Sequence, residues 1–559
     1  MKYHDFRIAV LVLLGILITS SESVAQNRVY FIGFTDRNNS PYSLQQPLHF
    51  LSQRAVDRRV NQGIALADDD LPVNPSYIDS IISLGAQHLN SIKWMNGITV
   101  LCDSNTLNSV LSLPFVGQYL AVRRLSGPKR VSSKFETLAG PAKRPSIVSS
   151  LSAQFDYGAA LRQIDQINGD VLHQTGFTGS GMRIATIDAG FNSADQHPAF
   201  DSLFASSRVV ATWDFVDRQN TVYEDDSHGT SVLSCMASNI PGVMVGTAPH
   251  AEYVLLRSED ANTEYVVEEY NWAAAAAYAD SAGCDLITSS LGYFYFDDGA
   301  MDHSYADMDG NTTPISRAAD IAATKGMLVL SSAGNTGNSS WRYIVAPADA
   351  DSILSVGAVD SAGYKAGLSA FGPSVDGRIK PEVAAMGART EVGMWNGTFG
   401  PANGTSFSCP VLAGAAACLW QAHPDKTNME IRQAILESSS YYNNPGDSLG
   451  FGIPDFQNAH LFLGGTTLNV PVTSGLREVY PIPAYNYINV DYHSSRPQNV
   501  IVKLFDIEGR EMIVRSYRTS SGNLNSWRME LSDAMPSGTY VLRVDGDDQV
   551  FFRKITVVR

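Results

Sequence analysis

Four polar residues have types that could together carry out a nucleophilic reaction. Ser406 lies in the run 403–410 (NGTSFSCP), where small residues surround the hydroxyl and Pro410 is expected in the first turn of a helix. Asp188 and Asn335 each end an apolar run typical of a strand, and His228 opens a run typical of a helix. Taken singly, each is as well explained as a cap or turn residue.

Taken together, the four residues supply the parts of acyl transfer. A serine hydroxyl needs a base to take its proton, and the imidazole of His228 titrates near neutrality. Asp188 would fix the other imidazole nitrogen and stabilise the cation. The Asn335 amide and the Ser406 backbone N–H would then bind the oxyanion.

Alternating strands and helices beyond residue 157 must position these residues. The apolar runs predict strands, and the alanine-rich or amphipathic runs predict helices, over these ranges: strands 183–187, 253–256, 286–289, 327–331 and 353–359; helices 230–238, 266–282 and 315–325. Repeated strand–helix units with continuous apolar strands indicate an α/β fold, a parallel sheet with helices on both faces. Ligands of such sheets bind where the strands end.

The stretch 157–463 resembles the subtilases, the subtilisin-like serine proteases. The resemblance is carried by GSG (179–181), IDAG (187–190), HGT (228–230) and GTS (404–406), in the Asp, His, Ser order of subtilisin. Further similar runs are GTAP (246–249), APA (346–348) and FGP (371–373). The resemblance implies a subtilisin-like fold and a serine endopeptidase that acts on polypeptides. It also implies that two segments flank the primary specificity pocket, namely Ser290, Leu291, Gly292 and Ala333, Gly334.

Two residues beside Ser406 depart from the family pattern. Phe407 stands where methionine is usual, and Cys409 stands where alanine or serine is commoner. Phe407 is expected to face the core. Cys409 is either a structural thiol or a residue that makes the enzyme sensitive to thiol reagents.

No cofactor is needed for this chemistry. Members of the family often bind structural calcium, but no run in the chain matches a calcium loop, so the metal ligands, if any, are unknown. Acidic residues at 297–298 and 302–309 are expected to form a solvated surface.

Charge and composition exclude some classes of binding partner and indicate in which cellular compartment the protein acts. The formal net charge of -16 disfavours nucleic acid or an anionic membrane as the main partner. Residues 1–25 read as a signal peptide, and no later run approaches the length of a membrane span. The five cysteines do not form a disulfide framework; one bridge remains open, but buried free thiols are favoured.

The remaining sequence divides around the catalytic stretch. Residues 26–124 predict a small α+β domain, with strands at 29–32 and 98–101 and helices at 50–62 and 77–84, and resemble the propeptides of secreted bacterial subtilases. The basic linker 125–156 contains Lys129-Arg130 and Lys143-Arg144, an expected processing region. A second linker, 464–475, leads to a β-sandwich at 476–559 that resembles the sorting domain of the type IX secretion system.

The resemblances of the two flanking domains imply how the protein folds, is inhibited and is exported. The propeptide would act as foldase and intramolecular inhibitor, and the C-terminal domain would engage the secretion machinery. The protein would cross the periplasm of a Gram-negative bacterium and be released or held at the cell surface.

Two other function classes compete with a peptidase. A binding protein or adhesin that keeps the fold would be favoured by loss of a catalytic residue, and none is missing. An esterase would predict a Gly-x-Ser-x-Gly elbow, which the run 404–408 (GTSFS) does not supply. The sequence leaves open the preferred substrate side chain and the maturation site.

Overall fold

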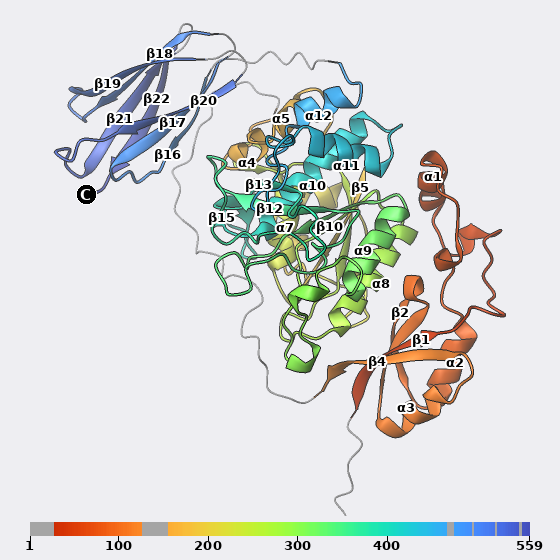
Figure 1. Cartoon of the computed structure of the whole chain (residues 1–559). Helices are drawn as coiled ribbons and strands as arrows, with labels where there is room; N and C mark the ends of the chain where they lie inside the picture. The colour runs from red at the N-terminus through yellow and green to blue at the C-terminus, as the bar shows by residue number, and fades with distance from the viewer. Residues whose placement is uncertain (1–26, 126–154, 467–474, 495–496, 520–522, 547–549) are drawn as a thin grey trace, which may run out of the picture. The chain divides into compact units, whose positions relative to one another are not determined.

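A computed structural model describes residues 27–125, 155–466, 475–494, 497–519, 523–546 and 550–559 (Figure 1). The chain divides into two compact units, residues 1–468 and 469–559, which are described separately. The predicted signal peptide, most of the linker 125–156 and most of the linker 464–475 lie outside the described residues.

The N-terminal part of the first unit is a four-stranded antiparallel sheet with helices. The strands follow the order β2-β3-β1-β4, with bounds β1 Arg28–Phe34, β2 Gln87–Ile92, β3 Gly97–Cys102 and β4 Val116–Arg124. The helices are α1 Gln53–Asn61, α2 Pro75–Ser83 and α3 Ser104–Leu111. Each begins where a side chain accepts a backbone N–H: Ser52, Asn74 and Asp103 are the three caps.

A seven-stranded sheet forms the centre of the first unit, and all neighbouring strands are parallel. Its order is β13-β12-β11-β10-β5-β9-β6. The bounds are β5 Arg183–Asp188, β6 Val209–Asp214, β9 Glu252–Arg257, β10 Leu286–Ser289, β11 Leu328–Ser332, β12 Leu354–Val359 and β13 Val383–Met386. This sheet is the α/β architecture that the sequence predicts.

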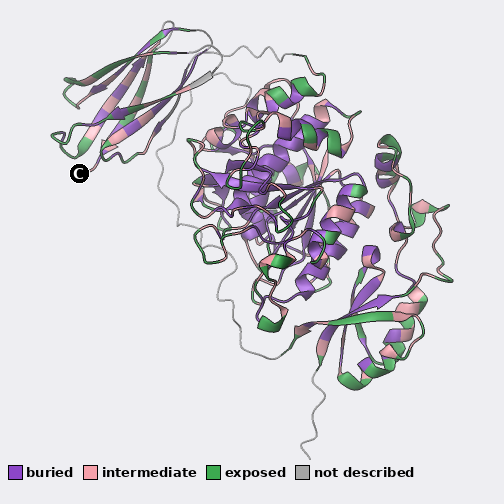
Figure 2. Cartoon of the chain, in the orientation of Figure 1, coloured by how far each residue is buried: buried purple, intermediate pink, exposed green. Residues whose placement is uncertain are grey.

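Helices cover both faces of the sheet, so that its strands are buried (Figure 2), apart from the edge strand β6, where Val210 is exposed. Residues of β9 alternate between two cores: Tyr253 and Leu255 face the core that contains the helices 228–237 and 405–422, and Val254 and Leu256 face the core that contains the helices 267–281 and 314–324. The helices of this part are α4 Leu161–Asp165, α5 Gly169–Gln174, α6 Asp201–Ala205, α7 His228–Ala237, α8 Val267–Ser281, α9 Pro314–Thr324, α10 Thr405–Ala422, α11 Asn428–Glu437 and α12 Phe456–Phe462. Two small hairpins accompany them: β7 Asn239–Ile240 with β8 Met244–Val245, and β14 Thr390–Gly393 with β15 Phe399–Ala402.

The second unit consists of two antiparallel sheets around one apolar core. One has the order β16-β17-β20 and the other the order β19-β18-β21-β22. The bounds are β16 Gly475–Tyr480, β17 Tyr487–Ser494, β18 Asn499–Phe505, β19 Glu511–Arg518, β20 Asn523–Glu530, β21 Gly538–Asp545 and β22 Val550–Val557. Alternate residues of β18, such as Val502 and Leu504, are buried, as a strand with one solvated face requires.

All five cysteines are free and buried, as the sequence favours. In the part of the chain that the structure describes, no helix has the length and apolar character needed to cross a membrane.

Candidate active site

Asp188 and His228 meet at the carboxyl end of the central sheet. Asp188 is the last residue of β5, His228 is the first of α7, and His228 Nδ1 lies 2.7 Å from Asp188 Oδ1. The Asp188 carboxylate is fully buried and also accepts the Ala189 N–H at 2.8 Å. Burial lowers the pKa of His228, but Asp188, with Asp226 and Glu259, more than offsets this, so the pKa lies above its ordinary value.

The start of α7 approaches β5 closely because position 229 is glycine. A Cβ there would come within 2.4 Å of the Gly190 carbonyl oxygen and 3.0 Å of the Asp188 Cβ. The Asp226 side chain accepts the His228 N–H at 2.7 Å and so fixes the entry to the helix. The HGT run therefore has a packing reason as well as a chemical one.

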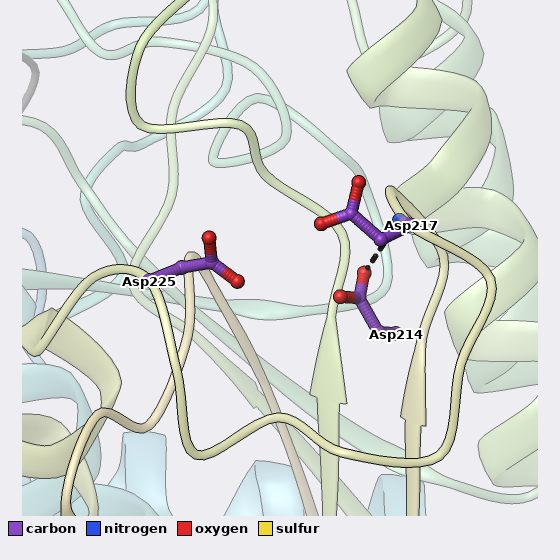
Figure 3. Close-up of side chains that lie close together, drawn as sticks. All are labelled: Asp214, Asp217 and Asp225. Carbon is purple, nitrogen blue, oxygen red and sulfur yellow. Dashed lines mark hydrogen bonds between the residues drawn. The ribbon is translucent and has the colours of Figure 1, made fainter.

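Arg257, the last residue of β9, organises the loop that leads to His228. Its Nη1 lies 2.8 Å from Asp214, 2.6 Å from Asp217 and 2.9 Å from Asp225. These four residues are called the Arg257 cluster. Figure 3 shows the three carboxylates, with Asp225 reaching across from the loop opposite Asp214 and Asp217.

The three carboxylates of the Arg257 cluster are close enough together to be considered as metal ligands. A guanidinium already lies among them, and its Nε also donates to the Ala189 carbonyl at 3.1 Å. We therefore regard the cluster as a structural tie between β5, β6 and the loop before α7.

Ser406 is the second residue of α10, which begins at Thr405 rather than near Pro410. The expectation that Pro410 occupies the first turn is wrong, because it lies inside the helix. A proline there cannot donate to the carbonyl four residues earlier, which belongs to Ser406. Ser290 Oγ donates to that carbonyl at 2.8 Å and replaces the missing bond.

Asn335 lies three residues beyond the end of β11, next to the start of α10. Its Oδ1 accepts hydrogen bonds from the Thr405 N–H and the Thr405 hydroxyl, both at 2.9 Å. The Asn335 side chain is therefore held through its oxygen and not through Nδ2, and Asn335 is an exposed residue.

One cavity of about 370 Å³ brings most of the predicted site residues together. His228, Ser406 and Asn335 line it, with Ser290, Leu291, Gly292 and Gly334. Asp188 lies behind His228, and Ala333 is fully buried in a small apolar cluster rather than in the cavity lining. The arrangement places a hydroxyl, an imidazole and an amide around one space that a peptide bond could enter.

The two unusual neighbours of Ser406 are both buried. Phe407 is 3% exposed, lines the cavity and lies with its ring centroid 6.0 Å from that of His228. Cys409 is fully buried, with Sγ 3.5 Å from Thr288 Oγ1, and burial raises its pKa to about 12. Of the two expectations for Cys409, the structural thiol fits this environment.

The cavity lining also contains two carboxylates that the sequence reasoning missed, Glu259 and Glu264. Glu259 comes two residues after the end of β9, so the rule that ligands bind where strands end could have found it.

The expectation that residues 297–298 form a solvated surface is also wrong. Asp297 accepts the Glu264 N–H at 3.2 Å, and Asp298 pairs with Arg124.

Comparison with known proteins identifies the family of the chain. A subtilisin of Bacillus pumilus is 31% identical over 303 residues, which cover 53% of this chain and 97% of the relative. Subtilisin NAT of Bacillus subtilis subsp. natto is 32% identical over 286 residues, which cover 50% of this chain and 66% of the relative. The model of the subtilase family matches residues 179–453. The chain belongs to the subtilase family.

The flanking parts of this subtilase match two further family models. Residues 29–136 match the peptidase S8 propeptide domain of Bacteroidota, and residues 478–558 match a secretion system C-terminal sorting domain. The protein is thus a subtilase with a propeptide and a sorting domain, and it is secreted or located at the cell surface, as the sequence predicts.

Solved structures of other proteases resemble part of this subtilase. The prenylagaramide maturation protease PagA is 20% identical, with a TM-score of 0.43, and the match covers 53% of this chain and 99% of that one. MycP1 with its N-terminal propeptide removed is 25% identical, with a TM-score of 0.43, and the match covers 54% of this chain and 96% of that one.

Proposed function

We propose that the protein is a secreted endopeptidase in which Ser406 is the nucleophile. His228 takes the serine proton and later gives it to the leaving amine, and Asp188 orients the imidazole and stabilises its cation. The observation that carries the proposal is the 2.7 Å contact between His228 Nδ1 and a buried Asp188, beside a cavity that also contains Ser406. The raised pKa of His228 suits a base that must hold a proton in the transition state.

The oxyanion would be stabilised by Asn335 Nδ2 and the Ser406 backbone N–H. The Ser406 N–H is one of the first four of α10, and these have no acceptor within the helix. The bonds from Thr405 to Asn335 Oδ1 support the role of the amide, because they fix its orientation before substrate binds. Ser290 to Gly292 and Gly334 line the cavity and would bind the substrate backbone, with Ala333 supporting them from behind.

The propeptide would inhibit the enzyme until the chain is cut within 125–156, and the sorting domain would direct export. Binding of the propeptide to the catalytic part is supported by the contacts of residues 52–62 and 93, which include Arg54 with Asp285 and Lys93 with Asp280.

A fluorophosphonate probe tests the proposal on the mature protein. We expect labelling of Ser406 and hydrolysis of peptide substrates. Ser406→Ala should abolish labelling and lower kcat by about a million-fold, the loss known for subtilisin. A folded wild-type protein that neither reacts with the probe nor cuts casein would instead support a binding protein.

A further inference from the structure

Two short segments of the cavity lining are bonded to the start of α10, where Ser406 lies. In the first segment, Ser290 Oγ donates to the Ser406 carbonyl oxygen at 2.8 Å. In the second, the Gly334 N–H donates to the Thr405 hydroxyl at 3.2 Å, and the next residue, Asn335, accepts the Thr405 N–H. Because both segments are attached beside the nucleophile, the substrate residue next to the scissile bond would lie against them.

The chain around Val345 is hydrogen-bonded to both segments. Tyr293, directly after Gly292, donates its N–H to the Ala346 carbonyl at 2.8 Å and accepts the Ala346 N–H at 3.3 Å. The Val345 N–H donates to the carbonyl of Ala333 at 3.4 Å. The backbone of Val345 and of its neighbour is therefore held on one side by the first segment and on the other by the second.

The Val345 side chain lies against the glycine of each segment. A Cβ at Gly292 would come within 2.3 Å of Val345 Cγ2, and a Cβ at Gly334 would come within 3.0 Å of the same atom. One methyl group thus contacts both glycines, and Val345 lines the cavity although only 3% of its surface is exposed. The isopropyl group occupies space that a large substrate side chain would need.

We propose that Val345 makes the pocket for the side chain before the scissile bond shallow, so that the enzyme cuts after small residues, alanine above all. The proposal rests on the proposed endopeptidase function and gives it a substrate class, polypeptides with a small residue before the cut. The methyl group of alanine can contact Val345 without displacing it. Phenylalanine, leucine or arginine would have to push Val345 aside against its backbone hydrogen bonds, and overpacking of this kind is costly.

The test on the wild-type mature enzyme uses peptide p-nitroanilides, in which the cleaved bond is fixed. The substrates are identical except for the residue before the cut, which is glycine, alanine, leucine, phenylalanine or arginine. We expect kcat/KM to be highest for alanine and to exceed the values for phenylalanine and arginine by at least about tenfold, the size of a modest overpacking effect.

Variants of Val345 test whether this side chain sets the depth. Val345→Ala and Val345→Gly should raise kcat/KM for phenylalanine relative to alanine in two steps, by at least about tenfold in total. The matched control is Val245→Ala, which removes the same atoms as Val345→Ala. Val245 is buried on β8 in a separate small cluster with Tyr157 and Ile164, so the control should leave the ratio unchanged.

The outcomes separate this inference from the proposed function. A wild-type enzyme that labels with fluorophosphonate but cuts after phenylalanine or arginine as well as after alanine overturns the shallow pocket alone. A wild-type protein that neither labels nor cuts any substrate overturns the function itself. If the preference for alanine persists unchanged in a Val345→Gly variant that still labels, Val345 does not set the depth. The wild-type series decides whether the pocket is shallow even if a variant does not fold.

Discussion

Two charged clusters in the first unit are opposites in composition. In the Arg257 cluster one arginine meets three aspartates, and all four residues belong to the catalytic part. In the other cluster the Asp280 carboxylate, on α8, meets Arg58, Arg59 and Lys93 of the propeptide. This second set is called the Asp280 cluster.

The difference lies in what happens when the propeptide leaves. The Arg257 cluster keeps all its partners and continues to hold the loop before His228. The Asp280 cluster loses its three cations together, and the Asp280 carboxylate then has water in their place. One cluster would thus remain part of the framework around the candidate active site, whereas the other is a contact that the proposed removal of the propeptide would release.

The largest effect is expected from Arg257→Met, which leaves three aspartates without their cation. Breaking a buried ion pair costs about 3–5 kcal/mol. The lower end applies here, because Asp217 and Asp225 are 55% and 34% exposed. In a Ser406→Ala background, which prevents autolysis, the thermal midpoint of the catalytic domain should fall by about 6–12 °C. Arg257→Lys is the control, and an unchanged midpoint in Arg257→Met would show that the cluster is not a structural tie.

The second-largest effect is expected from Asp280→Asn, and it concerns only the binding of the propeptide. Arg58 would then lie buried without a counter-charge and Arg59 would keep only Asp70, at a cost of about 3 kcal/mol, or about 100-fold in the inhibition constant of propeptide 27–125. The kcat/KM of the mature enzyme should not change, because Asp280 does not line the cavity. Equal inhibition of wild type and variant would contradict the comparison.

Much of the fold and of the site was predictable because it is encoded locally. The apolar runs that became β5, β9, β10, β11 and β12 were recognisable, and so were Asp188, His228, Asn335 and Ser406, which lie in short runs at strand or helix ends. Their assignment to catalysis nevertheless remains a proposal.

What could not be predicted depends on contacts between distant segments. Pro410 was placed in the first turn because the sequence does not show that the Ser290 hydroxyl would satisfy the Ser406 carbonyl. Asp298 was expected on a solvated surface because its partner, Arg124, lies far away in the propeptide. The grouping of Glu259, Glu264 and Glu268 was missed because these glutamates become neighbours only when the segment after β9 folds back onto α8.

A small effect is expected from Arg124→Ala. The pair with Asp298 is at the surface, since the Arg124 side chain is 47% exposed, and such pairs contribute about 0.2–1 kcal/mol. Inhibition by the propeptide should weaken by about 1.4- to fivefold at low salt and less at high salt. A loss as large as that of Asp280→Asn would mean that burial does not distinguish the two contacts.

The smallest effect is expected when the pH is changed, because the Asp280 carboxylate should stay ionised in the complex with the propeptide. Burial raises the pKa of Asp280, but Lys93, Arg58 and Arg59 outweigh it, so the pKa lies well below its ordinary value. A carboxylate with a lowered pKa contributes stability that is present above its unfolded pKa of about 4 and is lost only as the pH falls through the lowered value. The ratio of inhibition constants for Asp280→Asn and wild type should therefore stay constant from about pH 8 to pH 5. A ratio that falls within this range would mean that acidification alone can release the Asp280 cluster, and the distinction between a permanent and a releasable contact would then depend on pH as well as on proteolysis.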